Sequence, residues 1–457
     1  MWTFQGITTL SSALEAFQAQ LDVTGNNIAN VNTAGYSEET ANLVSSPSTP
    51  VTEGNTFQIG NGVTVQSVTR IQATYLQGSA YNAASALGMA NQQATTASSV
   101  NSTVLNGTTT GFESDISAFF NSWSSLASDP SSSSEKLAVQ QAGQTLANDF
   151  QTAGNGILQL QTTNTQQIQS TIQTIQSDVN QIASLNQQIE NSTAQGGTPN
   201  AMMDQRDQVV SNLASLMNVT VQNTSGGGVT INSGDLILVD QSGAHNVPTT
   251  YNAATSSLTS GANSFNISSG QLAGLFDSSN KLGSYQTSLN TLADQIQTQV
   301  NTLYATAADS TGTTGADFFS TTGSGATGLA LDPTIANNPD AILTGTSGNA
   351  SDGGVAQSIA DLATTSNAAL GNQSITDYYT TFVGQIGTDG KQADASQTTS
   401  EAVNTQVQNQ VQSITGVNLD DEMSNLLRFQ RSYQAAAQAL NTIDQTISGF
   451  LSAVQTG

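Results

Sequence analysis

The sequence of 457 residues contains no cysteine and a single histidine, His245. Without thiols, a cysteine nucleophile and a zinc site of the histidine–cysteine type are both excluded, and one histidine allows at most one histidine-based catalytic triad. His245 lies in the polar stretch SGAHNVP, where we expect an exposed side chain without a partner. The sequence therefore predicts no catalytic residues, no metal site, no cofactor and no enzyme activity.

Charged residues are scarce, and their balance is strongly acidic. Lys and Arg together number 7 against 32 Asp and Glu, which gives a net charge of −25, while charged residues make up only 9% of the chain. Such a chain repels nucleic-acid phosphates and anionic membranes, so neither is expected as a partner. Hydrophobic residues are only 36% of the chain, so we expect either a thin, elongated core or a core completed by other molecules.

Long apolar runs are also missing. No stretch approaches the 18 apolar residues of a membrane-spanning helix, and the first residues, MWTFQGITTL, lack the charged and apolar regions of a cleaved signal peptide. The chain therefore either stays in the cytosol or is exported by a route that reads an uncleaved end.

Both ends of the chain carry apolar residues at alternating spacings of three and four, which is typical of a coiled-coil seam. The N-terminal seam consists of Ile7, Leu10, Leu14, Phe17, Leu21, Ile28 and Val31, with Thr24 at the remaining seam position. The C-terminal seam includes Leu419, Met423, Leu426, Tyr433, Leu440, Ile447, Leu451 and Val454. The simplest arrangement brings the two ends together in one helical bundle and loops the rest of the chain out between them.

These patterns predict a mainly α, elongated protein with a small β domain. We expect residues 1–38 and 416–457 to form an inner terminal domain of coiled-coil type. Residues 39–217 and 283–415 are expected to form a helical-bundle middle domain, with a β-hairpin-like segment near 57–72. Residues 218–282, with short β-rich runs between Gly- and Ser-rich turns, predict a small β-rich outer domain. We also expect Asp129 to cap a helix that starts at Pro130.

Asparagines and a glycine crowd the end of the first predicted helix, in VTGNNIANVNTAGYS. Asn side chains bond to nearby backbone groups and end helices, and Gly adopts the left-handed conformation that follows a helix. The stretch therefore predicts an elbow that ends the first helix and turns the chain outward, with Asn26, Asn27, Asn30, Gly35 and Tyr36 as its main residues. Further along, Arg206 lies close to Asp204 and Asp207. It indicates either an ion pair within the chain, which we favour, or a contact between subunits.

The elbow resembles a motif of the rod, hook and hook-associated proteins of the bacterial flagellum, an axial protein family. The C-terminal stretch SITGVNLDDEMSNLLRFQRSYQAAAQALNTIDQTI is similar to the closing segment of that family, and NAMMDQRDQVVSNLASLMNVTV resembles a segment of its hook–filament junction members. One departure is that Glu38 and Glu39 follow Tyr36 and Ser37, where the family usually has Arg-Gln.

The resemblance implies an extracellular structural subunit of the flagellum, located at the junction between hook and filament and required for filament assembly and motility. It further implies export through the flagellar channel without a cleaved signal peptide. The implied partners are copies of the chain in a ring, the hook protein on one side, a second junction protein on the filament side, and an export chaperone that binds the C-terminal helix. The alternatives are another axial subunit, of hook or rod type, and a secreted coiled-coil adhesin.

Overall fold

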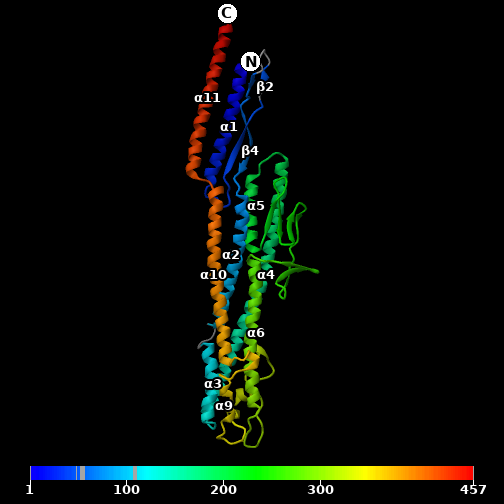
Figure 1. The fold of residues 1–457 in the computed structure, drawn as a ribbon, viewed down its shortest axis with the longest axis vertical. Coiled ribbons are helices and arrows are strands. Elements are labelled where there is room, and N and C mark those ends of the chain that lie inside the picture. The colour runs from blue at the N-terminus through cyan, green and yellow to red at the C-terminus, as the bar shows by residue number, and fades with distance from the viewer. Residues whose placement is uncertain (1, 48, 52–56, 106–110, 456–457) are drawn as a thin grey trace. The chain divides into compact units, whose positions relative to one another are not determined.

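The computed structural model describes residues 2–47, 49–51, 57–105 and 111–455. The chain forms two compact units: unit 1 comprises Met1–Ala84, Ile175–Val247 and Ala402–Gly457, and unit 2 comprises Ser85–Thr174 and Pro248–Glu401. Helices dominate both units, and the described strands form only small antiparallel sheets (Figure 1). This confirms the predicted class, mainly α with a small β part. Among the described helices, none is both long enough and apolar enough to cross a membrane.

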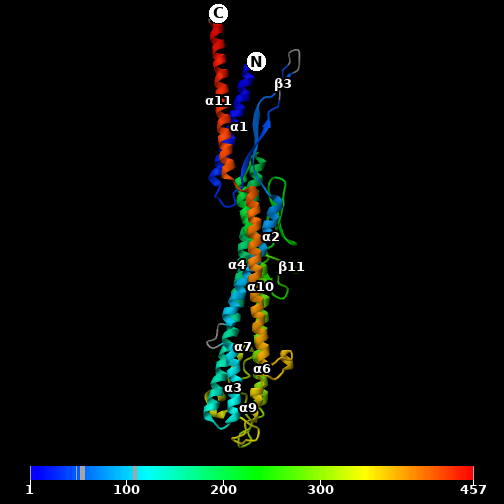
Figure 2. The same ribbon diagram turned by 60° about the vertical axis from the view of Figure 1, so that its left-hand side comes forward.

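The two terminal helices of unit 1 lie side by side. Figures 1 and 2 both show α1 (Trp2–Asn30) next to α11 (Leu419–Gln455), running in opposite directions. The start of α1 meets the second half of α11, since a Cβ added at Gly6 would lie 3.3 Å from the Ile443 side chain. The end of α1 meets the start of α11 through a hydrogen bond between Asn27 and Glu422. The predicted pairing of the N- and C-terminal helices is therefore confirmed.

A two-stranded ribbon covers another side of α1. It consists of β1 (Glu39–Ser45) and β4 (Val63–Arg70), paired antiparallel with Glu39 opposite Arg70 and a bulge between Asn42 and Leu43. The ribbon is joined to the helix through Ser12, whose hydroxyl accepts a hydrogen bond from the Val63 amide at 3.3 Å. Within the same segment, β2 (Thr49–Val51) pairs with β3 (Phe57–Ile59). The strands expected near 57–72 are therefore β3 and β4, whose partners lie upstream.

The remainder of unit 1 combines a helix with a four-stranded sheet. Helix α5 (Asn200–Leu216) precedes the sheet, whose strand order is β5-β6-β7-β8: β5 (Thr220–Asn223), β6 (Val229–Ser233), β7 (Leu236–Asp240) and β8 (Gly243–Ala244). Three long helices contribute residues to both units: α2 (Thr74–Val100), α4 (Ser133–Ala194) and α10 (Ile375–Thr415).

Unit 2 contains the other helices and a second small sheet. Its helices are α3 (Phe112–Ser128), α6 (Gln271–Tyr304), α7 (Gly325–Gly328), α8 (Pro333–Asn337) and α9 (Gly354–Asp361), with the π-helix η1 (Asn101–Leu105) and the 3-10 helices η2 (Pro339–Ala341) and η3 (Ala368–Leu370). Its sheet has the order β11-β10-β9: β9 (Thr250–Asn252), β10 (Ser257–Ser260) and β11 (Asn263–Asn266). The β-rich segment 218–282 thus supplies two separate sheets, one to each unit.

The helix expected to start at Pro130 begins later. Helix α4 starts at Ser133, and the Ser132 hydroxyl accepts a hydrogen bond from the Glu135 amide, which is the bond of an N-cap. Asp129 instead follows the end of α3, where its amide donates to the Ser125 carbonyl. The expectation for Asp129 and Pro130 was wrong because both residues belong to the turn that links the two helices.

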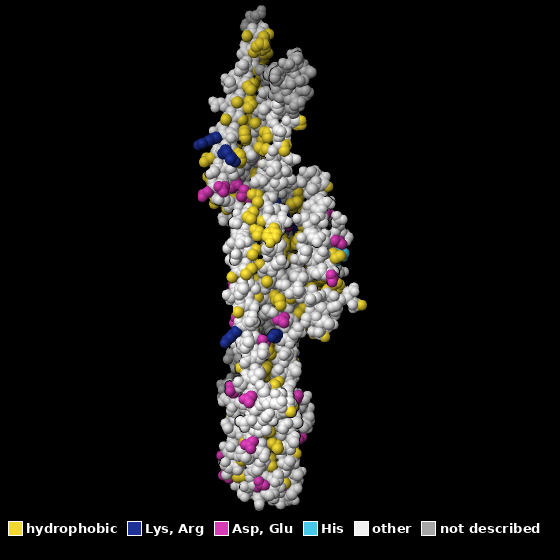
Figure 3. All heavy atoms as spheres, in the orientation of Figure 1, with side chains coloured by type: hydrophobic (Ala, Val, Ile, Leu, Met, Phe, Trp, Pro, Cys, Tyr) yellow, Lys and Arg dark blue, Asp and Glu magenta, His cyan; other side chains and the backbone are white. Residues whose placement is uncertain are grey.

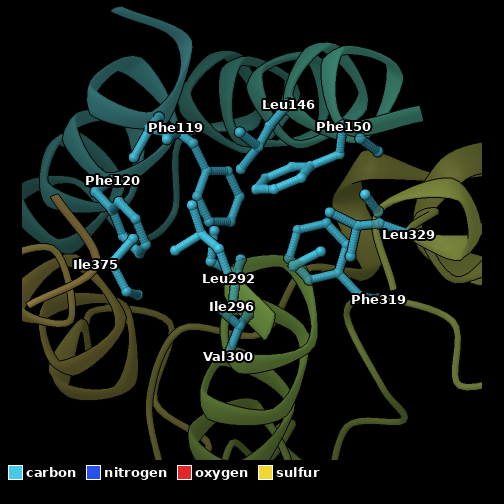
Figure 4. Close-up of a cluster of buried hydrophobic side chains, with 14 of the residues drawn as sticks. Phe119, Phe120, Leu146, Phe150, Leu292, Ile296, Val300, Phe319, Leu329 and Ile375 are labelled. Carbon is cyan, nitrogen blue, oxygen red and sulfur yellow. The ribbon is translucent and has the colours of Figure 1, made fainter. Parts of the chain in front are cut away.

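The core of unit 2 is built around aromatic side chains that come from distant segments. Figure 4 shows Phe119 and Phe150, from α3 and α4, directed toward Phe319 and the α6 residues Leu292 and Ile296. Trp123 is fully buried, and its ring centroid lies 5.1 Å from that of Phe318 in an edge-to-face arrangement. The Gly- and Thr-rich region 309–352 is therefore anchored in this core by Phe318 and Phe319, together with the buried side chains of Ala326, Leu329, Leu331, Ile335 and Ile342.

Two carboxyl groups meet at the edge of this core. Asp115 on α3 is 8% exposed and forms a hydrogen bond with Asp149 on α4. Burial, this hydrogen bond and the negative charge of Asp115 together raise the pKa of Asp149 from 3.8 to about 7. Below that pH the Asp149 carboxyl is protonated, and above it Asp149 carries a negative charge close to Asp115.

This pair makes the stability of unit 2 pH-dependent. Because the folded pKa of Asp149 is raised, its contribution is fully present below about pH 4 and is lost as the pH rises through about 7. We expect Asp149→Asn to flatten the pH dependence of unfolding between pH 4 and 8 and to be more stable than the wild type at pH 8. Denaturant unfolding at several pH values measures this. The exposed Asp394→Asn serves as the control, and a wild-type slope retained in Asp149→Asn would refute the assignment.

Candidate functional site

The end of α1 is held by the side-chain amide of Asn27, which is 1% exposed. Its Nδ2 donates to the Glu39 carbonyl oxygen at 2.9 Å and to Glu422 Oε1 at 3.1 Å. Its Oδ1 accepts from the Tyr36 hydroxyl at 2.7 Å and from the Glu39 amide at 3.0 Å. All four hydrogen-bonding positions of the amide are thus used. One side chain thereby joins α1, the elbow, the start of β1 and the first turn of α11.

The elbow itself is built from the residues that the sequence singled out. The helix ends at Asn30, whose carbonyl accepts from the Thr33 amide at 2.8 Å and whose side chain donates back to the Asn26 carbonyl at 3.0 Å. Gly35 has φ of +80°, and a Cβ there would lie 2.9 Å from Gln208 Oε1 on α5. A larger residue at position 35 would therefore meet backbone strain and would require the flexible Gln208 side chain to move.

A second group of polar contacts, separate from those of Asn27, connects the elbow to α5. Asp204 accepts from the Ser37 hydroxyl at 2.9 Å and from Arg70 Nη1 at 2.7 Å. The same guanidinium reaches Asp207 through Nη2 at 2.7 Å, so Arg70 at the end of β4 bridges two carboxylates of α5. Its side chain is only 4% exposed, and a buried guanidinium paired with two carboxylates fixes the geometry of its neighbours. Nothing in the sequence had distinguished Arg70 from any other strand residue.

Arg206 forms the intramolecular ion pair that we favoured. Its Nη2 lies 3.1 Å from Asp207 Oδ1, and its Nη1 donates to the Gly227 carbonyl at 2.6 Å, which connects α5 to the turn before β6. Unlike an ordinary surface pair, it is buried, with the residue 3% exposed. A buried guanidinium is costly unless its partners stay in place. Because Asp207 and Gly227 both belong to unit 1, Arg206 stabilises contacts within that unit and is not available for a contact between subunits.

A cleft of about 1000 Å³, with polar and apolar lining in similar amounts, opens beside the elbow within unit 1. It is lined by stretches of the elbow, of the β4–α2 connection, of α5 and of the α10–α11 connection, in the ranges 30–37, 70–81, 204–211 and 408–419. On the α11 side the surroundings are acidic. Burial raises the pKa of Glu38 above its ordinary value, and the carboxylates of Glu422 and Asp421 raise it further. Burial and nearby carboxylates, Glu39 foremost, likewise raise the pKa of the Tyr36 hydroxyl.

The predicted apolar seam residues of α1 are all half-buried, Thr24 at the remaining seam position is buried, and Val31 lies just after the end of the helix. The α11 seam divides into two groups. Half-buried members are Leu426, Leu440 and Ile447, whereas Leu419, Met423, Tyr433, Leu451 and Val454 are exposed. The side of α11 that packs toward α1 instead adds Glu422, Ala436 and Ile443. In Figure 3, yellow apolar side chains follow the length of the terminal helices on the face in view.

The single histidine does have a partner, contrary to our expectation. Its Nε2 lies 2.9 Å from Asp240 Oδ2, and the two residues flank the tight turn between β7 and β8. The Ser242 hydroxyl and His245 together lower the pKa of Asp240 to about 2. The contact could not be predicted because it depends on the β7–β8 hairpin. Among the described residues, no group of three or more His, Cys, Asp or Glu side chains could hold a metal ion.

Comparison with known proteins points consistently to the flagellum. The family model for the helical domain of flagellar hook-associated protein FlgK matches residues 97–319. The family of flagella basal body rod proteins matches residues 7–36, and that of the rod FlgEFG protein C-terminal region matches residues 408–449. The first of these spans parts of both units, including α5 and the four-stranded sheet of unit 1. The second covers most of α1 and the elbow, and the third covers the end of α10 and most of α11.

Full-length relatives carry the same name. Flagellar hook-associated protein 1 of Bacillus subtilis is 26% identical over all of this chain and 99% of the relative. That of Escherichia coli is 28% identical over 95% of this chain and 97% of the relative. The solved flagellar hook junction protein FlgK from Burkholderia pseudomallei has a TM-score of 0.62 and 16% identity, and the match covers 74% of this chain and all of that one. The resemblance to hook-associated proteins is thus confirmed. The proteins of this family are structural and not enzymes.

The Asn27 amide provides the first test of this site. In Asn27→Asp the carboxylate loses both donors and faces Glu422 Oε1 with a like charge, so we expect unit 1 to be destabilised by about 3 kcal/mol. Thermal unfolding followed by far-UV circular dichroism measures the change. The matched control is Asn32→Asp, which places the same charge at an exposed elbow position. Equal stabilities for the two variants would contradict the role given to Asn27.

Proposed function

We propose that this chain, a flagellar hook-associated axial protein by sequence and fold, is a structural subunit of the junction between the hook and the filament. Copies of it form a ring there, and the ring is required for filament assembly and for motility. The observation that carries the proposal is the antiparallel α1–α11 pair, in which neither helix buries its apolar face completely. Neighbouring subunits in a tube would cover that face.

The exposed apolar side chains of α11 support this role. Phe450, Leu451 and Val454 are 69%, 55% and 62% exposed, and Leu419, Met423 and Leu427 are 45%, 50% and 51% exposed. Exposed apolar groups at this density on one helix are typical of a protein–protein interface. Since a two-helix pair buries little surface for its length, packing against further helices would also stabilise the pair itself.

The roles of the segments follow from this arrangement. In this proposal, residues 1–38 and 416–457 make the inner contacts between copies. The helical segments 39–217 and 283–415 form the body of the subunit, and the β-rich segment 218–282 faces outward. The hook protein is the neighbour on one side and a second junction protein is the neighbour on the filament side. The names of the relatives, hook-associated protein and hook junction protein, support this placement.

The proposal includes the route to this location. The chain is exported through the flagellar channel, without cleavage of a signal peptide, and becomes an extracellular part of the flagellum. Before export, a dedicated chaperone binds the C-terminal helix and covers its apolar side chains. The proposal of a chaperone is supported by the exposure of those side chains in the single chain, because uncovered apolar surface promotes aggregation.

Deleting the gene tests the function directly. We expect cells that build hooks but no filaments and that release filament protein into the medium, which electron microscopy and immunoblotting of the medium detect. A loss of the hooks themselves would instead indicate a hook or rod subunit. Normal filaments and swimming would reject an axial role and favour a secreted adhesin.

Complementation with point variants tests the apolar face of α11. We expect Leu451→Asp to fold but to leave the deletion strain without filaments, because a carboxylate cannot be buried between packed helices. The matched control is Leu158→Asp on α4, which changes a leucine of 42% exposure in unit 2 and should restore filaments. Restoration by both variants would show that the tip of α11 is not an assembly contact.

A further inference from the structure

Three helices of unit 2 enclose a small cavity. It lies between α2, α6 and α10, each of which contributes four residues to the lining, and it has a volume of about 120 Å³. All of these residues belong to Ser85–Thr174 or Pro248–Glu401, so the cavity lies within one compact unit. Since an apolar cavity of about 150 Å³ binds benzene, this one has room for a ligand of about five non-hydrogen atoms.

The walls of the cavity are mostly apolar. Val100 on α2 is fully buried, Ala393 on α10 is 8% exposed, and Ala97 lies about one helical turn before Val100. Two hydroxyl groups of the lining are bonded to each other, because Ser278 Oγ donates to Thr96 Oγ1 at 2.9 Å. A ligand in this cavity would therefore remove its own apolar atoms from water, which favours binding.

Of the three charged side chains in the lining, two neutralise each other. Lys281 Nζ on α6 lies 3.0 Å from Asp389 Oδ1 on α10. Asp389 also accepts from the Tyr285 hydroxyl at 2.6 Å and from Gln385 Nε2 at 2.9 Å. Burial alone would raise the pKa of Asp389, but the hydrogen bonds from Tyr285 and Lys281 lower it below its ordinary value. The charge and both oxygens of Asp389 are thus engaged within the chain.

Asp277 is the third charged residue of the lining, and its charge is not neutralised. It lies four residues before Lys281 on α6, a spacing at which an acid and a lysine commonly pair, but Lys281 pairs with Asp389 instead. Asp277 Oδ2 accepts a hydrogen bond from the uncharged amide of Gln93 at 2.7 Å. With the described residues Asp277 forms no ion pair. The lining therefore has one negative charge in excess, on a half-buried carboxylate beside an apolar space.

We propose that this cavity binds a short primary alkylammonium ion, with the ammonium group at Asp277 and about four carbons against Val100 and Ala393. An ammonium group brings three donors and a positive charge, which match a carboxylate that the chain leaves without a cation. A single such carboxylate offers too few ligands for Ca²⁺, which takes about six to eight oxygens. The inference goes beyond the proposed function and does not depend on it.

The methyl groups of the lining report binding directly. We expect n-butylammonium, added at pH 7 to the purified chain with ¹³C-labelled alanine and valine methyl groups, to shift the NMR signals of Ala97, Val100 and Ala393 saturably. A ligand of this size should bind with a Kd of about 1–10 mM. n-Butanol has the same carbon chain but no charge, so it should bind at least about tenfold more weakly.

A conservative variant tests the role of the carboxylate. Asp277→Asn removes the charge and keeps an acceptor for Gln93, so it should weaken n-butylammonium binding about tenfold and leave n-butanol binding unchanged. The matched control is Asp394→Asn, which removes an exposed carboxylate next to Ala393 in the sequence and should leave both affinities unchanged. Equal weakening by the two variants would show only a general attraction of cations to an acidic chain and would overturn the proposal.

A second variant tests the space itself. Ala97→Leu fills part of the cavity, so it should abolish the saturable shifts of Val100 and Ala393 with either ligand, and circular dichroism verifies that the variant is folded. In the wild type, equal affinities for n-butylammonium and n-butanol would overturn the proposal, as would the absence of saturable shifts up to about 50 mM ligand. Because these measurements use the purified chain, filament assembly does not enter them, and a failure here leaves the proposed function standing.

Discussion

The structure of unit 1 depends on one buried amide. Asn27 lies where the first helix, the elbow, the first strand and the last helix meet, and its four hydrogen bonds engage all of them. Three of the four bonds use backbone or hydroxyl groups of the chain that follows within twelve residues, so they fix the direction in which the elbow leaves α1. The fourth reaches Glu422, 395 residues away, and sets the register of α11 on α1. No apolar side chain could specify both the direction and the register at once, because dispersion contacts lack direction.

The chain has few charged and few apolar residues, and the two kinds are unevenly placed in the structure. Unit 2 concentrates its aromatic residues into one core, where Trp123, Phe318 and Phe319 are all fully buried. The terminal helices instead leave much of their apolar surface uncovered. The arginines are also unevenly placed. Arg70 and Arg206 are buried and pair with carboxylates of α5, whereas Arg428 and Arg431 are exposed on α11. The aromatic core of unit 2 is therefore complete within the chain, whereas the terminal helices leave side chains such as Phe450 and Val454 exposed.

The sequence predicted the features that depend on local pattern. The pairing of the ends followed from the spacing of apolar residues, although its antiparallel direction did not, and the end of α1 followed from Asn30 and Gly35. The sequence could not show which asparagine of the elbow is structurally most important. Asn27 is buried and Asn26 is exposed only because of where β1 and α11 pack against α1. It also could not show which of the overlapping three–four patterns on α11 faces α1, because that face is identified by contacts such as those of Glu422 and Ile443 with α1. The roles of Arg70, Phe318 and the Asp115–Asp149 pair depend on contacts between distant segments, for which a single sequence holds no pattern.

The central claim is that Asn27 couples the end of α1 to the start of α11. Amide hydrogen exchange of the wild type and of Asn27→Ala, followed residue by residue, measures this coupling most directly. We predict that the variant exchanges faster in both α1 and the first turns of α11, by similar factors, while the unit 2 core around Phe119 and Ile296 keeps its protection. Faster exchange in α1 alone, with α11 unchanged, would contradict the claim and would reduce Asn27 to a local helix-ending residue.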